Sequence, residues 1–242
     1  MTIMKKYGLK LDPNGWFGIA SSEWINHSST ALIIIDMQNY DANRNWSFIG
    51  KRGTGTETSE STYYFDRIEK AVVPAIQRLR TYFREHGMPV FHVYYGSRLK
   101  EALDMPVLWR LRFEQHAEDT GKPFTPHANA PEMQIIDELK PLPGEIVLTK
   151  VTGSAFLSTN LCDLLRYNDI TSFLACGVWL HGCVENTVRV GCDLGFFPTL
   201  VEDGCAASDD AFHKAAIRVL GSLYCQVRDS SWILNHLKHM EK

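Results

Sequence analysis

The chain has 242 residues, of which 45% are hydrophobic, and a formal net charge of −3 with a pI near 6.3. It can therefore bury a full core, and its weak negative charge gives no electrostatic reason to expect nucleic acid or an anionic membrane as a partner. No apolar run is long enough to span a bilayer, and no signal-peptide core follows the first residues, so a cytoplasmic location is expected.

The cysteines are scattered and form neither a CxxC pair nor a compact framework. In a chain of this size that pattern indicates reduced thiols in the cytosol, most of them core residues. The six are Cys162, Cys176, Cys183, Cys192, Cys205 and Cys225.

Residues 1–29 carry turn-forming and aromatic residues before any strong strand. We expect an irregular N-terminal arm that packs on the domain or on a neighbouring subunit, anchored by Trp16, Phe17 and Trp24. No repeat, low-complexity tract or Pro-rich linker divides the remainder, so residues 30–242 are predicted to form a single domain.

The first strand is predicted over residues 31–36, an unbroken apolar run that ends in Asp36. A run without polar alternation indicates a parallel sheet that is covered on both faces. Asp36 itself is either a turn or N-cap residue, or a carboxylate at the sheet edge where open parallel sheets bind their ligands.

Residues 38–64 show no periodicity and include a Gly-rich stretch at residues 50–55. That stretch fits neither a Walker A loop nor a dinucleotide fingerprint, so a mobile loop at the mouth of a site is expected. Residues 66–86 have apolar side chains at helical spacing, and residues 89–95 read as the second strand.

Residues 97–131 are predicted to be a long ordered loop that contains aromatic and arginine side chains. Arg98, Arg110 and Arg112 could clamp a carboxylate or a carbonyl-rich substrate, or they could be solvated or paired with acidic residues. Both alternatives stay open. The substrate-selecting parts of the chain are expected within residues 38–64 and 97–133.

The second half of the chain alternates strands and helices. Strands are predicted at 145–150, 170–178, 197–202 and 224–228, and helices at 159–167, from Cys183 onward, and at 209–220 and 231–240. With the first half, this predicts a three-layer α/β/α fold around a mostly parallel sheet of about six strands in a Rossmann-like order.

Cys183 follows a Gly-bounded turn after a buried strand and opens a helix. The N-terminus of a helix favours an anion, so the thiol would be biased towards the nucleophilic thiolate. The alternative is a small buried residue without chemistry. Asp36, Lys150 and Cys183 each end or follow a strand, so all three are expected at one sheet edge, where they supply a base, a cation and a nucleophile for acyl transfer.

At these positions the chain resembles the isochorismatase-like cysteine hydrolase superfamily, which includes nicotinamidases and the N-carbamoylsarcosine, ureidoacrylate and biuret amidohydrolases. The resemblance covers roughly residues 30 to 230. It is carried by ALIIIDMQ at residues 31–38, KVTGSAF at 150–156 with TNL at 159–161, GVWLHGCVENT at 177–187, Glu202-Asp203 and Ala206-Ala207.

The resemblance implies a catalytic triad of Asp36, Lys150 and Cys183. Asp36 would take the thiol proton, Cys183 would attack a carbonyl to form a thioester, and the backbone N–H groups of Trp179 and Cys183 would form the oxyanion hole. It also implies a cis peptide bond between Val178 and Trp179, and a homodimer or homotetramer.

The nicotinamidases of the superfamily that this chain resembles carry an Asp-x-His metal motif shortly after the first strand. Here residues 39–60 contain no His, and Asp41 is followed by Ala42 and Asn43, so no catalytic metal and no other cofactor is predicted. The expected function is cysteine-dependent hydrolysis of a small linear amide, favouring carbamoyl or ureido compounds such as biuret, triuret or ureidoacrylate. The alternatives are a vinyl-ether hydrolase, a catalytically silent binding protein, and a NAD-binding protein, which the missing GxGxxG disfavours.

Several aromatic side chains near these motifs could line a small planar substrate. Trp46, Phe156 and His181 are the substrate-binding candidates, and Trp109 and Trp179 could contribute to the same wall. Each of the large aromatic residues could equally belong to the core, and His181 could be a structural or exposed residue.

Overall fold

The computed structural model describes residues 24–45, 59–121 and 126–240. In this part of the chain a six-stranded sheet has the order β3-β2-β1-β4-β5-β6, and every pair of neighbouring strands is parallel. The strands are β1 (Thr30–Ile35), β2 (Val90–Tyr95), β3 (Ile146–Lys150), β4 (Ser172–Gly177), β5 (Phe197–Cys205) and β6 (Gln226–Arg228). The predicted α/β class and strand order are confirmed.

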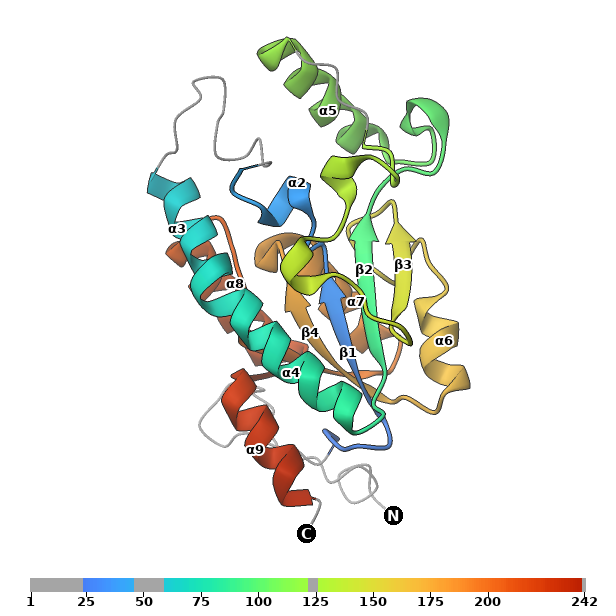
Figure 1. The fold of residues 1–242 in the computed structure, drawn as a ribbon, viewed down its shortest axis with the longest axis vertical. Helices are drawn as coiled ribbons and strands as arrows, with labels where there is room; N and C mark the ends of the chain where they lie inside the picture. Colours follow the sequence, from blue (N-terminus) through green and yellow to red (C-terminus); the bar gives the residue numbers. More distant parts are fainter. Residues whose placement is uncertain (1–23, 46–58, 122–125, 241–242) are drawn as a thin grey trace.

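Helices cover both faces of the sheet (Figure 1). One face carries α4 and α9, and the other carries α7 and α8, with α6 next to α7. The α-helices are α2 (Asn39–Ala42), α3 (Ser59–Arg67), α4 (Val73–Glu85), α5 (Val107–Thr120), α6 (Leu161–Tyr167), α7 (Glu185–Asp193), α8 (Asp210–Leu223) and α9 (Ser230–Met240). Within the described ranges, no helix is long and apolar enough to cross a membrane.

The sheet changes winding direction between β1 and β4. The chain leaves β1 towards β2 on one side and leaves β4 towards β5 on the other, and the two strands pair directly from Thr30–Ser172 to Ile35–Gly177. Such a reversal leaves a crevice outside the carboxyl ends of the strands, where open α/β sheets bind their ligands. α2 and α5 lie beyond this edge (Figure 1).

Gly177, the last residue of β4, makes the close approach of β1 and β4 possible. It has a φ of 113°, in the region that favours glycine, and an added Cβ would collide with the Ile35 carbonyl oxygen. The position therefore requires glycine both for its conformation and for the space it leaves.

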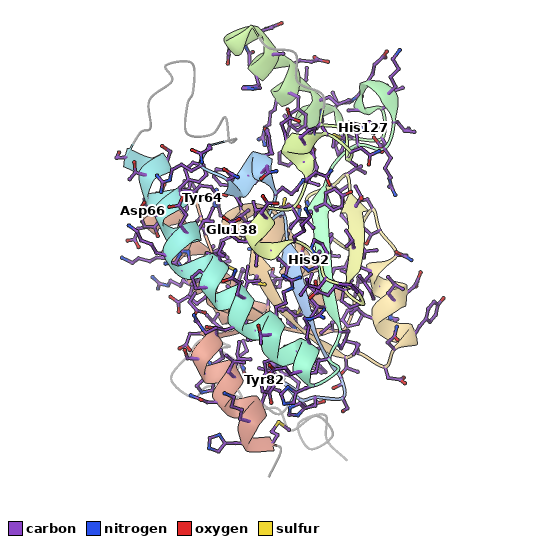
Figure 2. The ribbon with its side chains drawn as sticks, in the orientation of Figure 1. Tyr64, Asp66, Tyr82, His92, His127 and Glu138 are labelled. Carbon is purple, nitrogen blue, oxygen red and sulfur yellow. The ribbon has the colours of Figure 1, made fainter. Side chains whose placement is uncertain are left out.

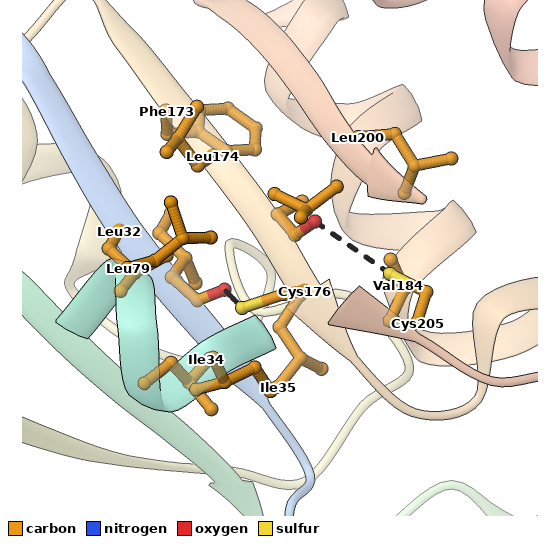
Figure 3. Packing of buried hydrophobic residues seen from close by; sticks show 14 of the residues in the cluster. Leu32, Ile34, Ile35, Leu79, Phe173, Leu174, Cys176, Val184, Leu200 and Cys205 are labelled. Carbon is orange, nitrogen blue, oxygen red and sulfur yellow. Dashed lines mark hydrogen bonds between the residues drawn. The ribbon is translucent and has the colours of Figure 1, made fainter. Parts of the chain in front are cut away.

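The core is built on the two central strands, because β1 and β4 are buried along their whole length. Figure 3 shows Ile34, Ile35 and Leu174 packed between the helix layers. Cys176 belongs to this core, and its thiol lies 3.4 Å from the Ile33 carbonyl oxygen. The continuous apolar strands follow from burial on both faces, as the sequence predicts.

Two predicted segments differ from the structure. The helix predicted over 66–86 begins seven residues earlier, at Ser59, because a π-helical turn, Ile68–Val72, joins α3 to α4. The segment 97–131, predicted as a loop, contains the fourteen-residue helix α5. Apolar side chains of α5 do not gather on one buried face, since Val107, Leu108 and Leu111 are exposed, so the helix has no readable amphipathic period.

Only part of the predicted N-terminal arm falls in the described residues. Trp24 is buried, as predicted: its indole Nε1 donates to Thr199 Oγ1 at 3.1 Å, and its ring stacks on Phe197. Trp16 and Phe17 lie outside the described residues.

A buried charge network joins α4 to the start of β3. Arg80 donates from Nε and Nη2 to the two Glu145 carboxylate oxygens, both at 2.6 Å, and the Leu142 N–H and His92 Nε2 lie within 3.0 Å of Oε2. The Glu145 side chain is only 2% exposed. Burial alone would favour the neutral acid, but these hydrogen bonds and the Arg80 charge lower the pKa of Glu145 to about 2.

Glu145→Gln is therefore expected to lower the free energy of unfolding by about 3 kcal/mol, because it leaves the buried Arg80 charge without its partner. Since the folded-state pKa lies below the ordinary value of 4.5, this stabilisation is fully present above about pH 4.5 and is lost as the pH falls towards 2. Urea unfolding at pH 7 measures the change. Glu138→Gln, at an exposed position, is the control, and an equal effect of both variants would contradict the assignment.

Candidate active site

Three predicted residues from separate strands meet at the carboxyl edge of the sheet. Lys150 Nζ lies 2.8 Å from Asp36 Oδ2, 3.3 Å from the Cys183 thiol and 3.1 Å from the Thr152 carbonyl oxygen. These partners account for the three protons of the ammonium group. The structure thus brings together the carboxylate, the ammonium group and the thiol that the sequence places at three strand ends.

Lys150 has to cross the end of β2 to reach Asp36, because β2 lies between β3 and β1. Its partner in register is Tyr95, the last residue of β2, and Nζ lies 4.9 Å from the centre of the Tyr95 ring. The aromatic face stabilises the ammonium along this path. Lys150 is completely buried, and Asp36 is 2% exposed.

Burial and mutual charge set the protonation of the site. Although burial disfavours its charged form, Asp36 and Cys183 raise the pKa of Lys150 above its ordinary value, so the side chain stays an ammonium. Burial raises the pKa of Asp36 and makes it a stronger proton acceptor, while the adjacent Lys150 opposes this shift.

The thiol differs from its prediction. Burial, followed by the charge of Asp36, raises the pKa of Cys183 well above its usual range, despite the opposing charge of Lys150. The helix α7 begins only at Glu185, and Cys183 lies in the preceding π-helical turn, Leu180–Val184. Burial thus opposes the thiolate that a helix N-terminus would favour.

The backbone around both reacting groups is unusual. Asp36 has a φ of 51°, which turns the chain sharply at the end of β1. The peptide bond between Val178 and Trp179 is cis, as predicted. The Thr187 hydroxyl donates to the Cys183 carbonyl oxygen at 2.7 Å and accepts from the Ala155 N–H at 3.0 Å, which ties the nucleophile turn to the segment after Lys150.

Asp41 and Tyr64 lie next to the site through Trp179, and no motif in the sequence points to either residue. Asp41 Oδ1 accepts a hydrogen bond from Trp179 Nε1 at 2.9 Å, and the Tyr64 ring stacks on the Trp179 ring with centroids 4.6 Å apart. Figure 2 shows Tyr64 where α3 approaches α2. Asp41 and Tyr64 thus contact the same side chain, that of Trp179, and burial, followed by the charges of Asp41 and Asp36, raises the pKa of the Tyr64 hydroxyl.

Gln38 links the chain segments next to the site by hydrogen bonds. Its amide Nε2 donates to the carbonyl oxygens of Tyr95 and Met133, both at 2.7 Å, and its Oε1 accepts from the Tyr95 N–H at 2.7 Å. A short antiparallel bridge pairs Gln38 with Ile135. These contacts join the end of β1 to the end of β2 and to the segment that precedes β3.

The substrate-binding candidates fall in three different places. The Phe156 ring packs against Phe173 and Phe196 in the core, which corrects its prediction as a wall of the site. The His181 ring lies between the rings of Trp179 and Phe212, and burial lowers its pKa. Trp46 lies outside the described residues.

The predicted loop residues around 97–131 lie on or near α5. Trp109 contacts Tyr95, and the Arg112 guanidinium stacks on the Trp109 ring at 4.7 Å. Arg98 lies 4.0 Å from the Asp104 carboxylate. In residues 24–45, 59–121 and 126–240, no group of three His, Cys, Asp or Glu side chains is arranged to hold a metal ion.

Comparison with known proteins places the chain in a family. The isochorismatase domain model matches residues 30–231. Ureidoacrylate amidohydrolase RutB of Pantoea ananatis is 31% identical over 191 residues, which cover 78% of this chain and 74% of that protein.

Solved structures agree. N-carbamoylsarcosine amidase from Thermoplasma acidophilum is 25% identical, with a TM-score of 0.59 over 84% of this chain and 96% of that one. A cysteine hydrolase from Pseudomonas syringae shares the fold with a TM-score of 0.71 at 19% identity, over 89% and 95% of the two chains. The resemblance seen in the sequence is confirmed, and the chain belongs to the isochorismatase family of hydrolases.

Proposed function

We propose that the protein is a cysteine-dependent amidohydrolase that cleaves a C–N bond of a small linear amide, with carbamoyl or ureido compounds favoured. One observation carries the proposal: the buried Lys150 ammonium contacts both the Asp36 carboxylate and the Cys183 thiol. A cation in this position stabilises the base and the developing thiolate together, which acyl transfer to sulfur requires.

In the first step Asp36 accepts the thiol proton as Cys183 sulfur attacks the substrate carbonyl carbon. Oδ2 of Asp36 is held by Lys150, whereas the buried Oδ1 has no hydrogen-bond partner of acceptable geometry among the described residues. Oδ1 is therefore the oxygen free to take the proton. The C–S bond forms and the carbonyl becomes an oxyanion.

The oxyanion is stabilised by the backbone N–H groups of Trp179 and Cys183, which flank the turn Leu180–Gly182. Asp36 then returns its proton to the leaving nitrogen, the C–N bond breaks, and ammonia leaves behind a thioester. Water attacks the thioester with Asp36 as base, which releases the acid and restores the thiol. Lys150 stays charged throughout and keeps Asp36 oriented.

The relatives support amide chemistry over vinyl-ether cleavage. Pantoea ananatis RutB is named for ureidoacrylate hydrolysis and the Thermoplasma acidophilum protein for N-carbamoylsarcosine hydrolysis. Both named substrates contain a carbamoyl group. We also propose a cytoplasmic location, which the free cysteines support. Assembly as a homodimer or homotetramer stays a prediction.

Ammonia release tests the proposal. The wild type is expected to release ammonia from at least one ureido compound among biuret, triuret, ureidoacrylate and N-carbamoyl amino acids, with a covalent acyl adduct on Cys183 in quenched mass spectra. Nicotinamide and maleamate serve as comparison amides. Turnover without an adduct would contradict the thioester route. Silence across the panel with cleavage of a vinyl ether would favour the isochorismatase-type reaction, and silence with both would favour a binding protein.

A further inference from the structure

We propose that Asp41 sets the charge selectivity of the active site and favours a neutral, N–H-rich amide over a substrate that carries a carboxylate beside the reacting group. This inference deepens the proposed function and rests on it for the identity of the substrate. The selectivity itself is a property of the pocket that can be measured without turnover.

Asp41 is fixed in place by aromatic partners. It lies in α2 just beyond the end of β1, is 8% exposed, and accepts the Trp179 indole N–H through Oδ1. Trp179 is itself held against the ring of Tyr64, with an interplanar angle of 20°. The second carboxylate oxygen of Asp41, Oδ2, accepts no hydrogen bond from a described side chain. It is therefore available to N–H groups of a ligand.

No described cation forms an ion pair with Asp41. The ammonium protons of Lys150 are directed to Asp36, Cys183 and the Thr152 carbonyl oxygen, so this charge acts on Asp41 without a hydrogen bond. The charge of Arg112 acts on Tyr40 and Tyr95, and its guanidinium stacks on the Trp109 ring.

Geometry links Asp41 to the nucleophile turn: it accepts the Trp179 indole N–H, and the Trp179 carbonyl oxygen accepts from the N–H of Val184, next to Cys183. A substrate carboxylate close to the Cys183 sulfur would be repelled by the Asp41 charge.

Trp179 contacts both Asp41 and a second group that suits an amide, Tyr64. The Tyr64 hydroxyl is buried and has no hydrogen-bond partner among the described residues. An unpaired buried hydroxyl is unfavourable unless a ligand completes it. With Asp41 Oδ2 as acceptor and Tyr64 as donor, the pocket complements the N–H and C=O groups of a urea-like compound.

Asp41 is ionised under mildly alkaline conditions. Burial and the nearby Asp36 charge raise its pKa to about 7, while the Trp179 indole and Lys150 oppose the shift. Burial, followed by the Asp41 charge, raises the pKa values of Tyr40 and Tyr64, so both phenols stay neutral. At pH 8.5 Asp41 is therefore predominantly an anion.

Alkylation of Cys183 by a matched pair of reagents measures this selectivity. Iodoacetamide is neutral and iodoacetate is anionic, and both attack the same sulfur, so their rate ratio at Cys183, followed by peptide mass spectrometry at pH 8.5, reports the local charge. The reference is the ratio of the iodoacetamide rate to the iodoacetate rate for free glutathione. At Cys183 of the wild type we expect this ratio to be about 10-fold higher than the reference.

Asp41→Asn removes the charge but keeps an oxygen that accepts the Trp179 N–H, and it is expected to bring the ratio within about twofold of that of glutathione. Asp41→Ser is a second variant in case asparagine disturbs folding. Asp137→Asn, at a side chain that is 97% exposed, removes the same charge far from the pocket and is expected to leave the ratio unchanged. A wild-type ratio equal to that of glutathione, or one that Asp41→Asn does not change, would overturn the proposal.

Turnover separates this inference from the proposed function. In the same proteins, kcat/KM for biuret and for N-carbamoylglycine is expected to favour biuret in the wild type, and Asp41→Asn is expected to narrow the difference. Charge selectivity in alkylation without any ammonia release would contradict the amidohydrolase assignment but support the proposed role of Asp41. Ammonia release without charge selectivity would support the amidohydrolase assignment and contradict the proposed role of Asp41.

Discussion

Replacement of Cys183 by alanine is expected to reduce amide turnover by at least about 10,000-fold, because the variant has no atom that can form the acyl intermediate. Residual activity would come only from substrate binding and oxyanion stabilisation. The measurement is steady-state ammonia release, with the substrate found to be the best of the ureido panel.

The fold should survive this change. Cys183 is only partly buried, so loss of its sulfur is expected to alter the free energy of unfolding by no more than about 1 kcal/mol. Cys192→Ala is the matched control, since Cys192 is another partly buried thiol, located in α7. It is expected to keep wild-type turnover. Full activity in Cys183→Ala, or equal losses in both variants, would refute the nucleophile assignment.

Replacement of Asp36 by asparagine is expected to lower kcat by about 1,000-fold, within the range that a general base contributes. Asparagine is the appropriate substitution because Asp36 has a φ of 51°, a conformation that asparagine tolerates better than most residues. The amide cannot accept the thiol proton, and the raised pKa of Cys183 means that the thiol does not ionise unaided.

The same substitution carries a stability cost that must be separated from catalysis. Lys150 is fully buried, and loss of its carboxylate partner at 2.8 Å is expected to lower the free energy of unfolding by about 3 to 5 kcal/mol. The double variant Asp36→Asn/Lys150→Met removes both charges. It is expected to recover much of the stability and none of the turnover.

Urea unfolding and ammonia release, measured on the two single variants and the double variant, complete the cycle. If the double variant regained activity together with stability, Asp36 would be a structural partner of Lys150 rather than the base. If Asp36→Asn kept wild-type kcat, proton transfer would have to be assigned to another group, and Asp41 would be the first candidate.

The family, the fold class and the convergence of Asp36, Lys150 and Cys183 could all be predicted from the sequence, for a common reason. Asp36, Lys150 and Cys183 are each attached to a buried apolar strand, and parallel strands deliver their ends to one edge of a sheet. The spacing of the apolar residues therefore determined both the layers of helices and sheet and the sheet edge at which these three side chains meet. The motifs at residues 31–38 and 177–187 then indicated the family.

Elements without such a period could not be placed. Helix α5 exposes Val107, Leu108 and Leu111, so its sequence lacks the one-sided pattern by which a surface helix is recognised. The position of Phe156, in a pocket or in the core, could not be predicted from the sequence either. An aromatic residue beside a catalytic motif fits a pocket or a core equally well, and only its packing against Phe173 and Phe196 decides for the core.

The chain by itself determined a parallel α/β sheet, its winding order and a thiol, a carboxylate and an amine at its carboxyl edge, because these follow from local apolar runs and short motifs. Only the folded structure decided that burial raises the pKa of Cys183 and that Asp41 and Tyr64 contact Trp179 beside the site. Both outcomes depend on burial and on distances between charges that belong to distant segments. Such quantities exist only once the segments have packed together.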